Sequence, residues 1–302
     1  MHSVYLPFTE DQLKPHFAKV RQNKICQSTS EKHIQYFKTS IQNYKRCPKG
    51  YNRKGKSLSE LKVPCQIEKD EKFWTASCLM TIFYSENRIH ELIQLFQQAY
   101  GDNPPIENLT SWKECLEGKF HLFFETNLPS PKSYKKWLRE NLNKQQFIPY
   151  LLDSDTGTKN LEGPTNADAI LLNPDNGFAV IIEAKVLSDI SCQITYDVMR
   201  NQIARNIDVM LESNDDLCPP LNKRDPAKTL FLLLTPKCFK DNPSSRLYGY
   251  KFYDYKKDPK SLSLDLSHRT GQNWQDISKR LGWLTWKDFN ETNKNCCGWL
   301  KT

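Results

Sequence analysis

The sequence lacks any long apolar run. Its longest stretches of consecutive hydrophobic residues, Phe178–Ile182 and Leu230–Leu234, have five residues each in a chain of 302. A helix that spans a bilayer needs about 20 apolar residues, so no membrane-spanning helix is expected. The first residues, M-H-S-V-Y-L-P-F-T-E-D, show no basic segment followed by an apolar one. No secretory signal is therefore expected, and the predicted location is the cytoplasm.

Several short motifs are missing as well. The sequence contains no P-loop, no G-x-G-x-x-G, no G-x-S-x-G and no internal repeat. Ten cysteines are present, but none forms a C-x-x-C pair, and the adjacent Cys296 and Cys297 have poor geometry for a zinc site. Without an export signal, we expect reduced thiols and no structural zinc.

Acidic residues are scarce near the N-terminus. From Lys14 to Lys62 there are 13 Lys or Arg and two acids, a net charge of +11, whereas the whole chain carries +8 and the remainder therefore −3. Such a block suits phosphate binding, and aromatic residues between the cations would allow base stacking. A solvated helical face with aromatics packed beneath it explains the pattern equally well. The candidate nucleic-acid contacts here are Lys45, Arg46, Arg53 and Lys54.

What the chain does have is a clear hairpin pattern between Thr165 and Val186. T-N-A-D-A-I-L-L-N is followed by the turn P-D-N-G and then by F-A-V-I-I-E-A-K-V. Two apolar runs around a Pro/Asn/Asp/Gly cluster predict a β-hairpin. The unbroken run Phe178–Ile182 predicts a strand covered on both faces.

Three charged residues lie where this hairpin closes on itself. Glu183 and Lys185 share one face of the second strand, roughly 6–7 Å apart, and antiparallel pairing at about 4.8 Å would bring Asp168 beside them. Two carboxylates so close repel each other unless one is protonated or a cation lies between them. Oxygen ligands suit Mg²⁺ or Mn²⁺, so we expect a metal site here.

The D…E-x-K arrangement of Asp168, Glu183 and Lys185 resembles the PD-(D/E)xK, or restriction-endonuclease-like, nuclease superfamily. The resemblance implies that Asp168, Glu183 and the main-chain carbonyl of Ala184 hold the metal, and that Lys185 orients the attacking water. The chain departs from the pattern in having no Pro before Asp168. Acid-x-Lys occurs six times in the sequence, but only the copy at Glu183 follows a five-residue apolar run. The alternative is a solvated strand end without a metal.

The expected order of elements agrees with that family. A helix over Lys132–Asn143, a strand at Phe147–Leu152, the hairpin, a helix from Ser188 or Ser191 to Glu212 and a strand at Thr229–Leu234 give α-β-β-β-α-β. The predicted class is α/β, with a mixed central sheet flanked by helices. We expect a basic, mostly helical region over 1–127 and a nuclease-like domain over 128–302 with its core at about 132–236. A strand at Leu247–Tyr255 and a helix at Trp274–Leu281 would extend it.

The resemblance also implies further site residues. The family's first helix often supplies another acid, for which Glu140 is the first candidate and Glu125 the second; an exposed helix residue is the alternative for Glu140. Gln202 and Arg205 are three residues apart and therefore neighbours on one face of the next helix. Arg can grip a phosphate with two hydrogen bonds, and Arg200 in the same helix is a further candidate contact for nucleic acid.

The sequence thus predicts a Mg²⁺-dependent or Mn²⁺-dependent nuclease. DNA is favoured over RNA as its substrate, and an endonuclease is favoured over an exonuclease. A non-catalytic nucleic-acid-binding or assembly module on the same fold is the first alternative, and a helical scaffold whose basic segment contacts an acidic protein is the second. Strandedness, sequence preference, a homodimeric state and the biological setting, restriction or phage defence among them, stay open.

Overall fold

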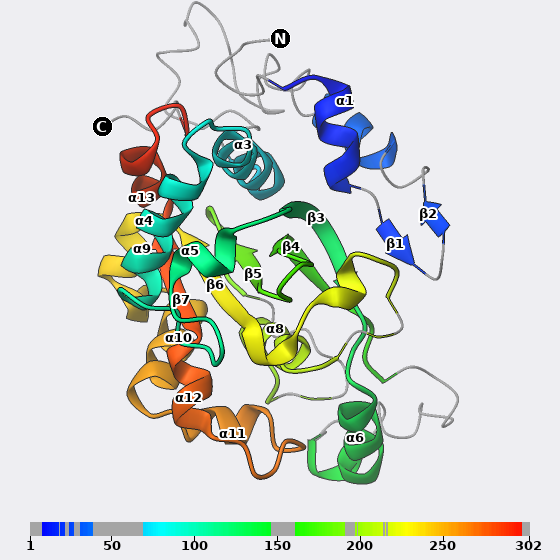
Figure 1. Ribbon diagram of the computed structural model, residues 1–302. Helices are drawn as coiled ribbons and strands as arrows, with labels where there is room; N and C mark the ends of the chain where they lie inside the picture. The colour runs from blue at the N-terminus through cyan, green and yellow to red at the C-terminus, as the bar shows by residue number, and fades with distance from the viewer. Residues whose placement is uncertain are drawn as a thin grey trace, which may run out of the picture.

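The protein was analysed as a computed structural model, which describes residues 8–17, 19–21, 24–26, 31–38, 69–145, 161–190, 197, 199–213, 215 and 217–297. Its centre is one open sheet of five strands in the order β3-β4-β5-β6-β7 (Figure 1). β3 pairs antiparallel with β4 and β4 antiparallel with β5, whereas β5, β6 and β7 run parallel to one another. The class is therefore α/β with a mixed sheet, as the sequence predicts.

The strands of this sheet are short and almost wholly buried. They are β3 (His121–Leu128), β4 (Thr165–Leu172), β5 (Ala179–Ala184), β6 (Thr229–Thr235) and β7 (Leu281–Thr285). Every residue of β5, β6 and β7 is buried, as expected of parallel strands covered on both faces. The remaining elements are α1 (Glu10–Leu13), β1 (Lys19–Arg21), β2 (Lys24–Cys26), α3 (Glu71–Phe83), α4 (Arg88–Tyr100), α5 (Trp112–Leu116), α6 (Lys132–Gln145), α8 (Gln202–Met210), α9 (Lys237–Asp241), α10 (Leu247–Lys257), α11 (Ser261–Asp265), α12 (Trp274–Lys279) and α13 (Trp286–Thr292).

Two hydrophobic layers cover the sheet. On one face α3, α4, α5 and α13 pack against alternate residues of the central strands, Val180 and Ile182 among them. On the other face α8, α10, α11 and α12 pack against Ile181 and its neighbours. The alternation of side chains along a strand sends consecutive residues of β5 into different layers. The position of a polar residue at the end of β5 therefore determines which face of the sheet its side chain points to.

The predicted hairpin is confirmed. β4 and β5 pair in the register Ala169↔Ile182 to Leu172↔Ala179. The connecting turn is closed by the backbone N–H of Asn173, which donates to the carbonyl of Phe178 at 2.8 Å. Gly177 adopts φ +80°, a left-handed conformation in which glycine is favoured.

The order of the core elements differs from the predicted one. The first strand of the sheet is β3, which lies before α6 in the chain and pairs with β4 from Leu128↔Thr165 to His121↔Leu172. α6 is therefore an insertion between two sheet strands and not the helix that opens the core, and the predicted strand at 147–152 lies outside the described residues. The boundary expected after residue 127 falls inside β3. α3 and α4, assigned to the N-terminal region, cover the sheet itself.

Other boundaries were wrong for identifiable reasons. Leu247–Tyr255 is helical, because its buried residues recur at helical spacing as Tyr248, Phe252 and Tyr255. Ser188 is not helical, and most of the predicted helix between 191 and 198 lies outside the described residues. α8 begins at Gln202, where the Asn201 side chain accepts the backbone N–H of Ala204 at 3.1 Å. β7 follows α12 directly, so the helix predicted to reach Leu281 ends two residues earlier.

The region over 1–127, expected to be mostly helical, is helical in part. Thr9 forms a capping box with Gln12 at the start of α1, which is followed by a 3-10 turn and by the β1–β2 hairpin. α3 and α4 are two separate helices, with residues 84–87 between them. In the described residues no helix is long and apolar enough to cross a membrane.

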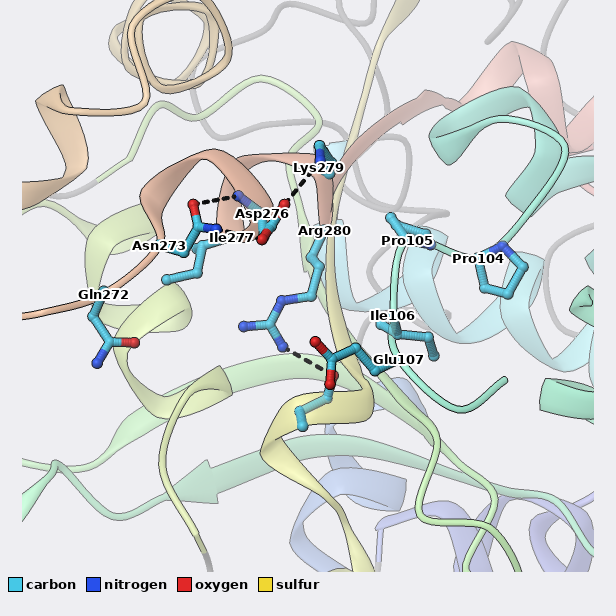
Figure 2. Close-up of a pocket in the computed structure, with 11 residues that line it drawn as sticks. Pro104, Pro105, Ile106, Glu107, Gln272, Asn273, Asp276, Ile277, Lys279 and Arg280 are labelled. Atoms are coloured by element: carbon cyan, nitrogen blue, oxygen red, sulfur yellow. Dashed lines mark hydrogen bonds and ion pairs between the residues drawn. The ribbon is translucent and has the colours of Figure 1, made fainter. Parts of the chain in front are cut away.

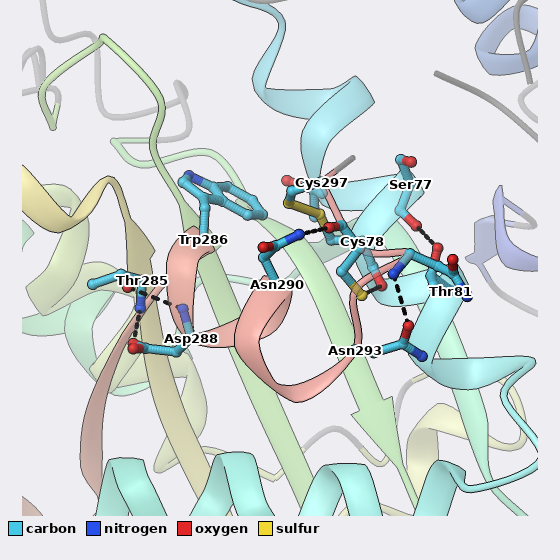
Figure 3. The surroundings of a disulfide bond; sticks show 12 residues. Ser77, Cys78, Thr81, Thr285, Trp286, Asp288, Asn290, Asn293 and Cys297 are labelled. Carbon is cyan, nitrogen blue, oxygen red and sulfur yellow. Dashed lines mark hydrogen bonds between the residues drawn. A yellow bond between two sulfur atoms is a disulfide. The ribbon is translucent and has the colours of Figure 1, made fainter. Parts of the chain in front are cut away.

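The expectation that all cysteines are free thiols is wrong for one pair. Cys78 on α3 and Cys297 after α13 form a disulfide, with their Cα atoms 5.9 Å apart (Figure 3). The neighbouring Cys296 is a buried free thiol, and burial raises its pKa well above the ordinary range. The sequence separation of 219 residues is what concealed this pairing from pattern reasoning.

Candidate active site

The pairing of β4 with β5 brings Asp168 to the end of β5. The backbone N–H of Ala184 donates to Oδ2 of Asp168 at 2.8 Å, so the carboxylate lies across the strand from the E-A-K segment. Asp168 remains partly accessible to solvent, whereas Glu183 is fully buried and Lys185 is 5 % exposed. The three residues that the sequence singles out are therefore neighbours at one edge of the sheet.

Glu183 is held from two sides. Lys185 Nζ lies 2.5 Å from its Oε1, as expected for residues i and i+2 on one strand face. The side-chain amide of Asn206, on α8, donates to its Oε2 at 2.8 Å. The carboxylate thus has a fixed orientation and carries one ammonium and one amide as donors.

The protonation equilibria of these groups depend on one another. Burial, and then the charge of Glu183, raise the pKa of Asp168 well above its usual range, and the Lys185 ammonium offsets only part of this. Burial also raises the pKa of Glu183 against the opposing effect of Lys185. Burial alone would lower the pKa of Lys185, but Glu183 and Asp168 outweigh it and raise the value. Lys185 is therefore protonated, and the two carboxylates lack a full complement of positive charge.

Two further acids stand around this centre, and sequence reasoning missed one of them. Glu71, in the first turn of α3, accepts the backbone N–H of Val186 at 2.8 Å and the hydroxyl of Ser188 at 2.5 Å. Its charge contributes to the raised pKa values of Glu183 and Lys185. Glu71 is the middle residue of the acid-x-Lys motif that begins at Asp70, but no local signal ties it to residues more than 110 positions later.

The other acid is Glu125 of β3, the second choice of the sequence analysis. It is buried at φ +51°, accepts from Lys72 Nζ at 2.8 Å and from the Asn166 amide at 3.0 Å, and its charge acts on Asp168. Glu140, the first choice, is exposed on α6 and has no such contact with the site. The reason is topological, because α6 is inserted after β3 and does not cover the sheet edge.

The two site residues predicted on α8, Arg205 and Gln202, make different contacts. Arg205 is held by Glu162 at 3.3 Å and by the carbonyls of Gly163 and Pro164, both at 3.2 Å. Gln202 opens α8 and its carbonyl accepts the amide of Asn206 at 3.2 Å. Asn206, four residues after Gln202, is the residue of this helix that the structure joins to Glu183, and the sequence analysis did not choose it.

Arg200 is not a surface contact. It is 1 % exposed, pairs with Glu162 at 2.9 Å and with Asp208 at 2.5 Å, and lies 3.5 Å from the centre of the Tyr134 ring. A guanidinium with these partners anchors α8 to the inserted segment and is unavailable to a phosphate. Lys45, Arg46, Arg53 and Lys54 lie outside the described residues.

The back of the site is supported by the C-terminal segment. The indole N–H of Trp286, at the start of α13, donates to the carbonyl of Lys185 at 2.9 Å. The ring of Trp286 meets that of Trp74 edge to face at 5.3 Å. α3, which carries Glu71 and Lys72, is thereby packed against the same segment.

A cavity of about 530 Å³ lies at the opposite end of the parallel strands (Figure 2). Ala227 and Arg280, which precede β6 and β7, line it together with the 104–107 loop and α12. Arg280 donates to the carbonyl of Pro226 at 2.7 Å. The cavity is thus separate from Asp168, Glu183 and Lys185, which lie at the carboxyl end of β5.

Within the part of the chain that the structure describes, no group of three or more His, Cys, Asp and Glu side chains gathers as a metal-binding cluster. A comparison with protein-family models, with curated proteins and with solved structures found no match for this chain.

Proposed function

We propose that the protein is a metal-dependent nuclease that hydrolyses phosphodiester bonds in nucleic acid, with DNA the favoured substrate and internal cleavage the favoured mode. The observation that carries the proposal is the meeting of Asp168, Glu183 and Lys185 at the edge where β4 and β5 pair. The order α5–β3–α6–β4–β5–α8–β6 supports it in part, since apart from the inserted α6 it follows the α-β-β-β-α-β order of the superfamily that the sequence resembles.

The donor set fits a hard divalent cation. The two carboxylates offer oxygen ligands of the kind that Mg²⁺ and Mn²⁺ prefer, and the main-chain carbonyl of Ala184 lies between them and Lys185 in sequence. Burial raises the pKa of Asp168 first, and the charge of Glu183, which Lys185 only partly offsets, raises it further. Asp168, Glu183 and the Ala184 carbonyl would hold Mg²⁺ or Mn²⁺, which when bound lowers the pKa of water and neutralises phosphate charge.

The other residues have roles that follow from their contacts. Lys185, protonated and in contact with Glu183, would stabilise negative charge on the phosphate and orient a nucleophilic water. Asn206 fixes the orientation of Glu183 through its 2.8 Å hydrogen bond. Glu71 holds the backbone immediately after Lys185 and adds negative potential to the centre.

A non-catalytic nucleic-acid-binding or assembly module is the second candidate, and one observation favours it. Glu183 is fully buried, and both of its oxygens already accept hydrogen bonds, from Lys185 and from Asn206. A buried pair of this kind can be purely structural. Under this alternative the two acids take up no metal.

The test is incubation of the protein with plasmid, linear duplex, single-stranded DNA and RNA in the presence of Mg²⁺, Mn²⁺ or EDTA. Asp168→Asn removes one negative charge with little change of shape, and Glu291→Gln makes the same change of charge at an exposed position of α13. Cleavage that needs the metal, survives in Glu291→Gln and disappears in Asp168→Asn supports the nuclease. Equal cleavage by wild type and Asp168→Asn would refute it.

A further inference from the structure

The solvent-facing side of α10 carries two large aromatic residues. Tyr250 is 58 % exposed and Tyr253 is 56 % exposed. Residues three and four positions apart share one side of a helix, so Tyr250, Tyr253 and the exposed Lys257 form one stripe. This stripe, called the α10 stripe below, consists of these three residues.

Tyr250 and Tyr253 are not part of the hydrophobic core. Tyr248, Phe252 and Tyr255 occupy the opposite side of the helix and pack in the core against the sheet. The aromatic residues of α10 thus serve two faces, and those of the stripe gain nothing from burial. Two neighbouring solvent-exposed rings on a helix can stack with planar groups of a partner.

The charge around the stripe favours an anionic partner. Residues 246–260 contain five Lys or Arg and two Asp, a net charge of +3, and one of the two acids, Asp254, lies on the stripe side of the helix four residues after Tyr250. Lys251 and Lys256 are engaged with Asp265 and with backbone carbonyls, respectively. Lys257 and Lys260 are exposed, and no ion pair is found for either within the described residues.

The first turn of α10, which precedes the stripe, is joined to the segment that follows the candidate active site. Asp189, four residues after Lys185, accepts the backbone N–H groups of Leu247 and Tyr248 at 2.8 and 3.1 Å. This holds the first turn of α10 to the segment that leaves β5. Tyr250, the first residue of the stripe, follows this contact by two residues.

We propose that the α10 stripe binds single-stranded nucleic acid, with unpaired bases stacked on Tyr250 and Tyr253 and the backbone phosphates against Lys257. Exposed rings beside cations are the arrangement that binds single strands with little sequence preference. A duplex keeps its base faces covered by its own stacking and gains nothing from the two rings. The inference rests on the proposed nuclease function, which explains why a strand would bind near the carboxyl end of β5.

The experiment is fluorescence anisotropy in EDTA, which prevents metal-dependent cleavage, with labelled oligo-dT, oligo-U and a duplex of about 20 nucleotides each. The variants are Tyr250→Ala with Tyr253→Ala, the matched pair Tyr250→Phe with Tyr253→Phe, and Lys257→Ala. Lys287→Ala on α13 is the control, because it removes the same charge from an exposed position outside the stripe.

In the Ala pair, the loss of stacking at each ring is expected to weaken single-strand binding about tenfold. The Phe pair is expected to keep wild-type affinity, because stacking needs the ring and not the hydroxyl. Lys257→Ala is expected to reduce the salt dependence, by about 0.7 in the slope of log K against log salt, and Lys287→Ala to leave it unchanged. Loss confined to oligo-dT or to oligo-U identifies the natural strand and supports the proposal.

Unchanged affinity in the Ala pair, or an equal loss on duplex, would overturn it. The result is separable from the nuclease assignment. If binding depends on the stripe but no metal-dependent cleavage is seen, the stripe proposal stands and the nuclease proposal fails. If cleavage is seen but binding does not depend on the stripe, the nuclease proposal stands and the stripe proposal fails.

Discussion

Asp168 accepts the backbone N–H of Ala184 through its side chain at 2.8 Å, just beyond the last paired residues of β4 and β5, Ala169 and Ile182. A carboxylate in this position terminates the ladder between the two strands and is fixed beside Glu183 at the same time. The same contact therefore serves the fold and the proposed chemistry. Its consequences for stability can be measured apart from any activity.

Replacing Asp168 with Asn should stabilise the metal-free protein near neutral pH. The variant removes a partly buried carboxylate next to Glu183, and the raised pKa of Asp168 shows that its charged form is disfavoured in the folded state. Thermal unfolding should show a higher Tm for Asp168→Asn than for wild type in EDTA. Saturating Mg²⁺, at about 100 times its Kd, should stabilise wild type by about 2.7 kcal/mol and leave the variant nearly unchanged. A Mg²⁺ shift of equal size in both would contradict the metal site.

The pH dependence of stability follows from the same raised pKa. Because the folded state holds the proton of Asp168 more tightly than the unfolded chain does, its contribution to stability is complete below the unfolded value near pH 4 and is lost as pH rises through the raised folded pKa. The Tm of wild type in EDTA should thus fall relative to that of Asp168→Asn as pH increases above about 4. Parallel Tm curves for the two proteins would show that Asp168 titrates normally.

Lys185→Met should destabilise the fold strongly. The substitution leaves Glu183 buried without its cationic partner, and breaking one side of a buried pair costs about 3–5 kcal/mol. Urea unfolding measures the loss. Mg²⁺ should restore part of the stability if a cation can take the place of the ammonium charge, while cleavage stays absent. Lys279→Met on α12, whose exposed pair with Asp276 is weak, is the control and should lose less than about 1 kcal/mol.

Asn206→Ala tests the residue that sequence reasoning overlooked. Loss of its 2.8 Å hydrogen bond leaves Oε2 of Glu183 without this donor, which should cost about 1–3 kcal/mol of stability. A ligand that loses its supporting hydrogen bond typically binds metal about 10–100-fold more weakly, so the Mg²⁺ concentration needed for half-maximal cleavage should rise. An unchanged Mg²⁺ requirement with reduced stability would leave Asn206 a purely structural residue.

Arg200→Met should affect folding and leave nucleic-acid affinity alone. Its guanidinium pairs with Asp208 and Glu162 in a buried network, so removing it takes away the cation that the two acids share. Breaking a buried pair in this way costs about 3–5 kcal/mol. Burial alone would raise the pKa of Asp208, but His268, Arg200 and Arg269 together hold it well below its usual range. Anisotropy at a temperature where the variant is folded should give wild-type affinity. A selective loss of affinity would restore Arg200 as a nucleic-acid contact.

The sequence alone determined the parts of the protein that depend on neighbours in the chain. The hairpin from Thr165 to Val186 followed from two apolar runs and a turn, and the strand face shared by Glu183 and Lys185 followed from the two-residue period. The contact of Asp168 with the end of β5 followed from antiparallel pairing. These are local rules, and each acts over about 20 residues.

Tertiary structure decided everything that joins distant segments. Glu71 and Glu125 reach the site because α3 and β3 pack around the sheet edge. The family resemblance made Glu125 only a second candidate, and no local sequence signal indicated Glu71. Arg200 looks like a phosphate contact in sequence, but its neighbours in space are buried acids. Leu247–Tyr255 is apolar enough for a strand or a helix, and only packing against the sheet selects the helix. Burial and long-range charge set the role of each ionisable group, and a sequence pattern records neither.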